Sequence, residues 1–212
     1  MLSTHCLYAE NMTKEINGRR VLDHLSLSLE GGKVCGVVGG SGAGKTMLIR
    51  ALAGLVHLEE GRVLLDGREK KDWETEPVIG LLADGAALYP QLTGFQNLWC
   101  LAQIRGRADR EMVREAMEVM GLEPGDTKRA GRYSPEMMRR LLAAQAIMER
   151  PDFLFWDEPA DMPGEESAVL FRSQIQKAAA RGAVAVITGR SREEIESLCS
   201  EIYFMEAGRI GK

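Results

Sequence analysis

The residues Gly39-Gly40-Ser41-Gly42-Ala43-Gly44-Lys45-Thr46 are the strongest indicator of the fold in this 212-residue chain. It fits the pattern G-x-x-x-x-G-K-[ST] and follows the apolar run Val34–Val38, which predicts a strand that enters a helix through a glycine-rich loop. Backbone N–H groups of such a loop suit a phosphate group. The pattern assigns Lys45 to the β- and γ-phosphates and the Thr46 hydroxyl to Mg²⁺. We therefore expect all eight residues to bind a nucleoside triphosphate, with a chance glycine-rich turn as the alternative.

A second pattern lies further along the chain, where four apolar residues, Phe153–Trp156, run into Asp157 and Glu158. In proteins with a phosphate loop of this kind, a buried strand beside the loop's own strand delivers an Asp to the second shell of Mg²⁺. Asp157 fits that role. Glu158 is placed to orient or deprotonate a water that attacks the γ-phosphate. The alternative is a buried strand whose polar end is simply solvated.

Composition places the chain among ordinary globular proteins, with 45% apolar residues, 27% charged residues and a net charge of -4. This charge gives no reason to expect nucleic acid as a partner, because nucleic-acid binders are usually strongly basic. The four cysteines are scattered, which favours buried thiols over disulfides or metal ligands. We expect no signal peptide, and no apolar run approaches the ~18 residues of a membrane span.

The order of predicted elements indicates an α/β fold in one domain, residues 1–212. Two opening strands joined by a turn at Asn17-Gly18 predict an antiparallel subdomain. A helical insert, approximately residues 85–150, separates them from a second alternation of strands and helices, which favours a mostly parallel core sheet covered on both faces. Strands are expected at 7–12, 21–29, 34–38, 61–67, 78–82, 153–156, 183–187 and 202–205, and helices after residue 46 and at 95–104, 110–120, 135–148, 165–180 and 193–199.

Taken together, the phosphate loop, the Asp157-Glu158 pair, the helical insert and the opening antiparallel strands resemble an ATP-binding cassette (ABC) ATPase from about Leu7 to Gly208. The resemblance implies the P-loop NTPase fold of that type, ATP and Mg²⁺ as ligands, and ATP hydrolysis with Glu158 as the catalytic residue. It also implies a homo- or heterodimer of cassettes that powers or regulates transport through a separate membrane-spanning subunit. The cassettes themselves are then expected to be cytoplasmic and peripheral at the inner face of the cell membrane.

The family's signature, L-S-G-G-Q, is replaced here by Tyr133-Ser134-Pro135-Glu136-Met137. Ser134 can cap the following helix and Pro135 suits its first position. However, the signature contacts the γ-phosphate on the opposite subunit through backbone N–H groups, and Pro135 has none. Glu136 brings a negative charge, and unit charges ~5 Å apart at an effective dielectric of ~20 repel by about 3 kcal/mol. A carboxylate in the first turn of a helix is also a common stabilising device.

Four further positions depart from the family. Arg190 stands at the switch histidine; it can pair with phosphate but cannot accept a hydrogen bond, and a solvent-exposed turn arginine is the alternative. Asp84 replaces the glutamine that contacts Mg²⁺ and the attacking water, and Gly164 replaces an Asp that contacts the opposite subunit. The aromatic residue that stacks on adenine falls at Ile16, which lacks a π face.

These departures share a direction, because the residues that act on ATP within one subunit remain while those that complete the site across a dimer have changed. The sequence therefore predicts that binding survives better than hydrolysis, and a heterodimer with an intact partner is chemically sensible. The alternative is a non-transport regulatory module with little ATPase activity. A P-loop kinase is disfavoured, because no lid with clustered arginines is evident.

Overall fold

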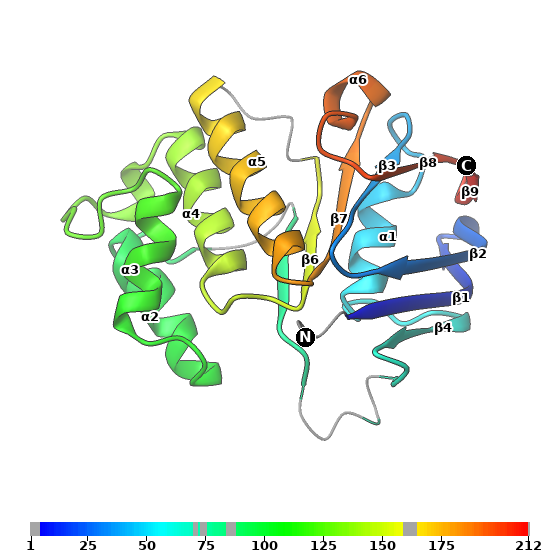
Figure 1. Ribbon diagram of the computed structural model, residues 1–212, viewed down its shortest axis with the longest axis horizontal. Coiled ribbons are helices and arrows are strands. Elements are labelled where there is room, and N and C mark those ends of the chain that lie inside the picture. The colour runs from blue at the N-terminus through cyan, green and yellow to red at the C-terminus, as the bar shows by residue number, and fades with distance from the viewer. Residues whose placement is uncertain (1–4, 70–71, 73–75, 84–87, 159–164, 212) are drawn as a thin grey trace.

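The computed structural model describes residues 5–69, 72, 76–83, 88–158 and 165–211, which form two sheets flanked by helices (Figure 1). The smaller sheet is antiparallel, in the order β2-β1-β4, with β1 at Cys6–Ile16, β2 at Arg19–Glu30 and β4 at Glu60–Leu65. Along β2 the buried side chains alternate, as predicted for a half-buried strand, with Leu25, Leu27 and Leu29 inside. This confirms the predicted antiparallel subdomain.

The larger sheet has the order β5-β6-β7-β3-β8-β9. The first five strands in this order pair with one another in parallel, and β9 pairs antiparallel with β8 at the edge. All residues of β3, β6 and β7 are buried, as expected of central parallel strands covered on both faces. The bounds are β3 Val34–Val38, β5 Ile79–Leu82, β6 Phe153–Trp156, β7 Val184–Gly189, β8 Glu201–Glu206 and β9 Arg209–Gly211.

Helix α1, Lys45–Leu52, lies between the two sheets (Figure 1). Its apolar face, with Leu48, Ile49 and Leu52 almost fully buried, packs into the core that the sheets share. On the other face of the parallel sheet, α5, Glu165–Ala180, contributes Phe171 and Ile175 to a second core. The two elements that flank the phosphate loop, β3 before it and α1 after it, are therefore both packed into the core.

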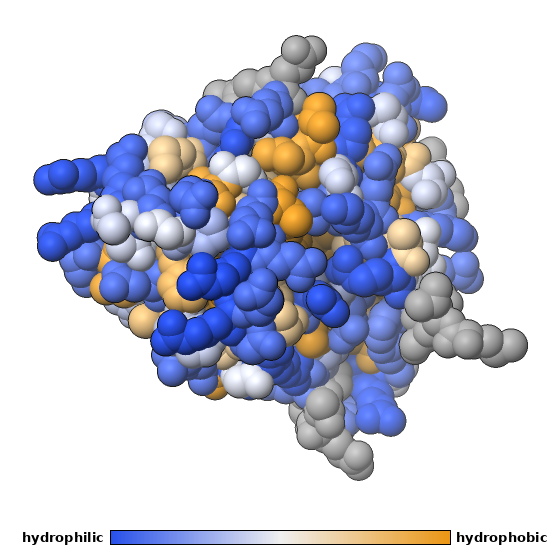
Figure 2. All heavy atoms as spheres, turned by 60° about the vertical axis from the view of Figure 1, so that its left-hand side comes forward, coloured by the Kyte–Doolittle hydropathy of each residue, from blue (hydrophilic) through white to orange (hydrophobic). Residues whose placement is uncertain are grey.

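The helical insert contains α2, Gly94–Arg105, α3, Arg110–Val119, a short 3-10 helix, Ala130–Arg132, and α4, Pro135–Ile147. The three α-helices begin at capping side chains. At α4 the Ser134 hydroxyl accepts from the Met137 N–H at 3.1 Å, with Pro135 at the first helical position, as predicted. Figure 2, which brings this side forward, shows mostly hydrophilic residues with hydrophobic ones gathered in a band in its upper middle part. The division of the chain into one domain with a subdomain at about 85–150 stays a prediction.

Three expectations need correction. The helix expected at 193–199 is a single turn, α6, Arg192–Ile195, and β9 was not among the expected strands. All four cysteines are described and none of them forms a disulfide, but only Cys35 is buried. Cys6 and Cys199 are partly exposed, and Cys100 on α2 is exposed. Burial raises the pKa of the half-buried Cys199 thiol to about 12.

Among the residues that the structure describes, no helix has the length and apolar character needed to cross a membrane.

Candidate nucleotide-binding site

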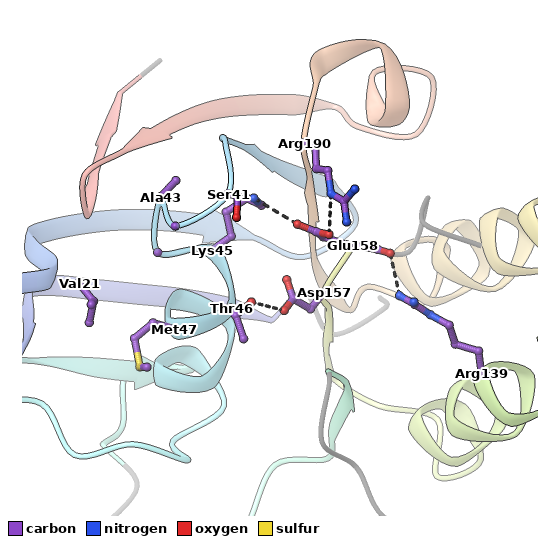
Figure 3. A pocket seen from close by; sticks show the side chains of 12 residues that line it. Val21, Ser41, Ala43, Lys45, Thr46, Met47, Arg139, Asp157, Glu158 and Arg190 are labelled. Atoms are coloured by element: carbon purple, nitrogen blue, oxygen red, sulfur yellow. Dashed lines mark hydrogen bonds and ion pairs between the residues drawn. The ribbon is translucent and has the colours of Figure 1, made fainter. Parts of the chain in front are cut away.

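The phosphate loop forms the floor of an open cavity of about 670 Å³ (Figure 3). Strand β3 delivers the loop from between β7 and β8, and α1 begins at Lys45 directly after it. The predicted residues Ser41–Thr46, Asp157, Glu158 and Arg190 all line this cavity, together with Val21, Met47 and Arg139. The structure thus brings together two motifs that are far apart in the sequence.

Two of the loop glycines are required by the chain's own packing. A Cβ at Gly39 would collide with the Met205 carbonyl oxygen, and one at Gly44 would lie 2.5 Å from the Val21 carbonyl oxygen. Gly44 also has a φ of 109°, in the region that favours glycine. By contrast, a Cβ at Gly40 or Gly42 meets nothing within 4 Å. The loop is therefore tight against its own fold at both ends and open toward the cavity between them.

Lys45 links the loop to Glu158 and Arg190. Its side chain is only 5% exposed, and its ammonium donates to the carbonyl oxygens of Gly39 at 2.6 Å and Gly40 at 3.1 Å. The same ammonium lies 3.2 Å from Glu158 Oε1, while Arg190 Nε lies 3.1 Å from Glu158 Oε2 (Figure 3). A carboxylate is thus held between two cations at the mouth of the loop. Arg190 is 58% exposed and pairs with this carboxylate, so its role at the switch position stays a prediction.

Asp157, directly after β6, connects the end of this strand to α1 and to β7 through hydrogen bonds of its side chain. Its Oδ2 accepts from the Thr46 hydroxyl at 2.6 Å, and its Oδ1 accepts from the Thr188 hydroxyl at 2.6 Å. The expectation that β6 lies beside the loop's strand is wrong, because β7 separates β6 from β3. Asp157 still reaches Thr46 because parallel strands end at the same edge of a sheet. Hydroxyl and carboxylate oxygens are ligands that Mg²⁺ accepts, so the Thr46–Asp157 pair fits this ion.

The signature-position residues Ser134, Pro135 and Glu136 do not line this cavity in the described structure. Glu136 turns along α4, where its Oε1 lies 2.5 Å from the Ser167 hydroxyl and 2.9 Å from Arg140 Nη2. The Ser167 hydrogen bond, and then the Arg140 charge, hold the pKa of Glu136 below its usual value of 4.5. Its charge is therefore partly compensated within the subunit, so its repulsion of a phosphate is weaker than the sequence alone suggests.

The other predicted positions lie apart from the cavity or outside the described residues. Ile16, at the end of β1, is 40% exposed and is not among the lining residues of the cavity. Its role as a base contact stays a prediction. Asp84 and Gly164 lie outside the residues that the structure describes.

Sequence reasoning missed four residues of the site. Val21 and Met47 supply apolar surface at the end of the cavity opposite Glu158 (Figure 3). Thr188 holds Asp157, and it also accepts from the Glu158 N–H at 2.8 Å. Arg139 reaches the cavity from α4. A Thr at the end of a predicted central strand was a usable signal for Thr188, whereas nothing in the sequence pattern separated Arg139 from its neighbour Arg140.

A phosphate loop between a buried parallel strand and a helix, faced by an acidic pair from another strand, defines a P-loop nucleotide-binding domain. Comparison with known proteins is more specific, since the family described as ABC transporter matches residues 22–161. The chain belongs to the ABC transporter family, as an ATP-binding subunit.

Individual relatives cover nearly the whole chain. The uncharacterized ABC transporter ATP-binding protein YybJ of Bacillus subtilis (strain 168) is 35% identical over 201 residues, which are 94% of this chain and 92% of the relative. The bacitracin transport ATP-binding protein BcrA of Enterococcus faecalis is 30% identical over 99% of this chain and 69% of its own. In structure, the ATP-binding cassette MJ0796 superposes with a TM-score of 0.86 at 18% identity over 97% of each chain, which confirms the fold.

Proposed function

We propose that this chain binds Mg-ATP in the cavity over the phosphate loop, and that it hydrolyses ATP slowly unless a second cassette completes the site. One observation carries the proposal: the Glu158 carboxylate lies between the Lys45 ammonium and the Arg190 guanidinium. The terminal phosphate of ATP is an anion that both cations can accept in place of Glu158. Their transfer to phosphate leaves the carboxylate available to a water molecule.

The remaining contacts are divided among the lining residues. Thr46 and Asp157 would hold Mg²⁺, which neutralises phosphate charge when it is bound. Val21 and Met47, with Ile16 as the sequence predicts, offer apolar surface to the base. None of the three has a π face, so we expect the base contact to be weaker than stacking on an aromatic ring.

Slow hydrolysis follows from the chemistry of two positions. Arg190 has no hydrogen-bond acceptor, so it cannot help Glu158 to orient a water as a histidine can. At the signature, Pro135 lacks the backbone N–H that would reach a phosphate on an opposite subunit. Both changes impair turnover more than binding, because neither removes a contact made by the phosphate loop.

The intact phosphate loop and the altered signature of this chain together favour a heterodimer with a different cassette. A partner cassette with an intact signature would complete the site at Gly39–Thr46, whereas the end of α4 here would leave the second site impaired. We also propose that the pair acts at the inner, cytoplasmic face of the membrane through a separate membrane-spanning subunit. Of the two roles that the sequence left open, membership of a transporter family supports transport over a separate regulatory module.

The test is ATP binding and single-turnover hydrolysis by the wild type and Glu158→Gln, alone and with a candidate partner cassette. We expect Glu158→Gln to bind ATP with unchanged or tighter affinity and to lose at least about 100-fold in rate. Glu118→Gln, an exposed carboxylate change on α3, is the matched control. Fast hydrolysis by the isolated wild-type chain, or an unchanged rate in Glu158→Gln, would contradict the proposal.

A further inference from the structure

Arg139 joins the helical insert to the end of strand β6. It lies in the second turn of α4, and its Nη2 donates to the main-chain carbonyl oxygen of Glu158 at 2.9 Å (Figure 3). The next residue, Arg140, is buried and points to Glu136, Ser167 and Glu166 instead. Two adjacent arginines of one helix therefore serve different contacts, and only Arg139 is directed at the candidate site.

The backbone of Glu158 is held from two sides. Its N–H donates to the Thr188 hydroxyl on β7 at 2.8 Å, and its carbonyl oxygen accepts from Arg139 on α4. Glu158 has a φ of 44°, in the left-handed region that is uncommon for a residue other than glycine. Such a conformation persists only where surrounding contacts impose it. The two hydrogen bonds are contacts of that kind, and they also set the direction in which the carboxylate leaves the chain.

We propose that Arg139 is a positioning residue for Glu158: it holds the backbone from which the carboxylate reaches toward Lys45 and Arg190. The inference rests on the proposed function, since it assigns a role in the same reaction. It adds that the helical insert contributes to the site within its own subunit. A displacement of α4 relative to β6 would break or lengthen this hydrogen bond, so the catalytic carboxylate is tied to the position of the insert.

Arg139 also lines the cavity, so a direct contact with the nucleotide is the competing explanation. The two roles predict different kinetics. A positioning residue changes the rate of the chemical step at saturating ATP and leaves the affinity unchanged, whereas a residue that touches phosphate changes the affinity. A misplacement of about 1 Å in a reacting group can cost about 100-fold in rate.

The experiment compares Arg139→Gln and Arg139→Lys with the wild type, and uses Arg172→Gln, an exposed arginine on α5, as the matched control. Single-turnover hydrolysis of radiolabelled Mg-ATP gives the rate, and anisotropy of a fluorescent ATP analogue gives the Kd. We expect Arg139→Gln to lose about 10- to 100-fold in rate with a Kd within about twofold of the wild type. Arg139→Lys, which keeps a donor, should regain part of the rate. The control should match the wild type.

A double-mutant cycle then separates positioning from a general structural effect. Adding Arg139→Gln to Glu158→Gln should cost no further rate, because the group that Arg139 positions is already lost. An additive loss in the double variant, an unchanged rate in Arg139→Gln, or a loss explained by a weaker Kd would each overturn the inference. An unchanged rate in Glu158→Gln alone would instead contradict the proposed function. Thermal unfolding of each variant checks that it is folded at the assay temperature.

Discussion

The phosphate-loop edge of the parallel sheet and the N-terminal end of α4 differ in how their side chains are held. At the first, Lys45 and Asp157 are 5% and 6% exposed, and each makes more than one contact with neighbouring elements. At the second, Ser134 and Pro135 are exposed, and Glu136 is bonded within its own subunit. Side chains at the first region hold elements of the fold together and line the candidate site, so we expect a change there to cost both stability and ATP binding.

The end of α4 separates these two requirements. A helix start needs a capping side chain and tolerates proline at its first position, and this chain meets both conditions. A phosphate contact from an opposite subunit needs backbone N–H groups that a proline removes. We therefore propose that the sequence at this region satisfies the fold without satisfying the contact. Three substitutions test whether the two regions differ in this way.

The largest effect is expected for Lys45→Ala at the phosphate-loop edge. It removes the cation that we assign to the phosphates and leaves Glu158 with one partner fewer. Truncating one partner of a buried charge pair across a binding interface costs about 2–5 kcal/mol, so ATP affinity should fall by at least about 30-fold. Anisotropy of a fluorescent ATP analogue measures it, with the exposed Lys177→Ala on α5 as control. Equal affinities in both variants would show that the loop does not bind ATP.

An intermediate effect is expected for Arg190→His, which tests a position at the phosphate-loop edge that departs from the family. Histidine removes the ion pair to Glu158 and supplies a hydrogen-bond acceptor, so single-turnover hydrolysis should rise by about tenfold. Because Arg190 is 58% exposed, the loss in ATP affinity should be small. Arg190→Lys keeps the charge and should not gain rate. A fall in rate in the histidine variant would mean that Arg190 assists hydrolysis.

The smallest effect is expected for Glu136→Gln at the end of α4, and it depends on pH. The hydrogen bond from Ser167 and the charge of Arg140 lower the pKa of Glu136 below 4.5 in the folded chain. A lowered carboxyl pKa stabilises the fold above the unfolded pKa, and this contribution is lost as pH falls through the folded pKa. Chemical denaturation should therefore show wild type more stable than Glu136→Gln at pH 7.

That difference should shrink toward zero as the pH falls below about 4.5. The exposed Glu118→Gln on α3 should show no such dependence. ATP affinity should be the same in wild type and Glu136→Gln, because Glu136 does not line the cavity of its own subunit. A change in affinity as large as that of Lys45→Ala would remove the distinction between the two regions.

Much of the fold was predictable because its signals are local. The buried strands Val34–Val38 and Phe153–Trp156 are short apolar runs, and the start of α4 is marked by Ser134 and Pro135. The helix expected at 193–199 was wrong beyond one turn, because the chain at 200 returns to the sheet through the Ser200 N–H bond to the Val34 carbonyl oxygen. Such a long-range constraint leaves no periodic trace in the sequence.

The phosphate loop and the acidic pair were readable from the sequence, because each is a run of consecutive residues whose chemistry depends on its own neighbours. The family followed from the order of these motifs along the chain. Tertiary packing, in contrast, places Glu158 between Lys45 and Arg190, turns Glu136 to Arg140, and brings Arg139 to the Glu158 backbone. These contacts join α1, α4 and the ends of β6 and β7. Their geometry is set by how the helices pack on the sheet, and spacing along the chain does not encode it.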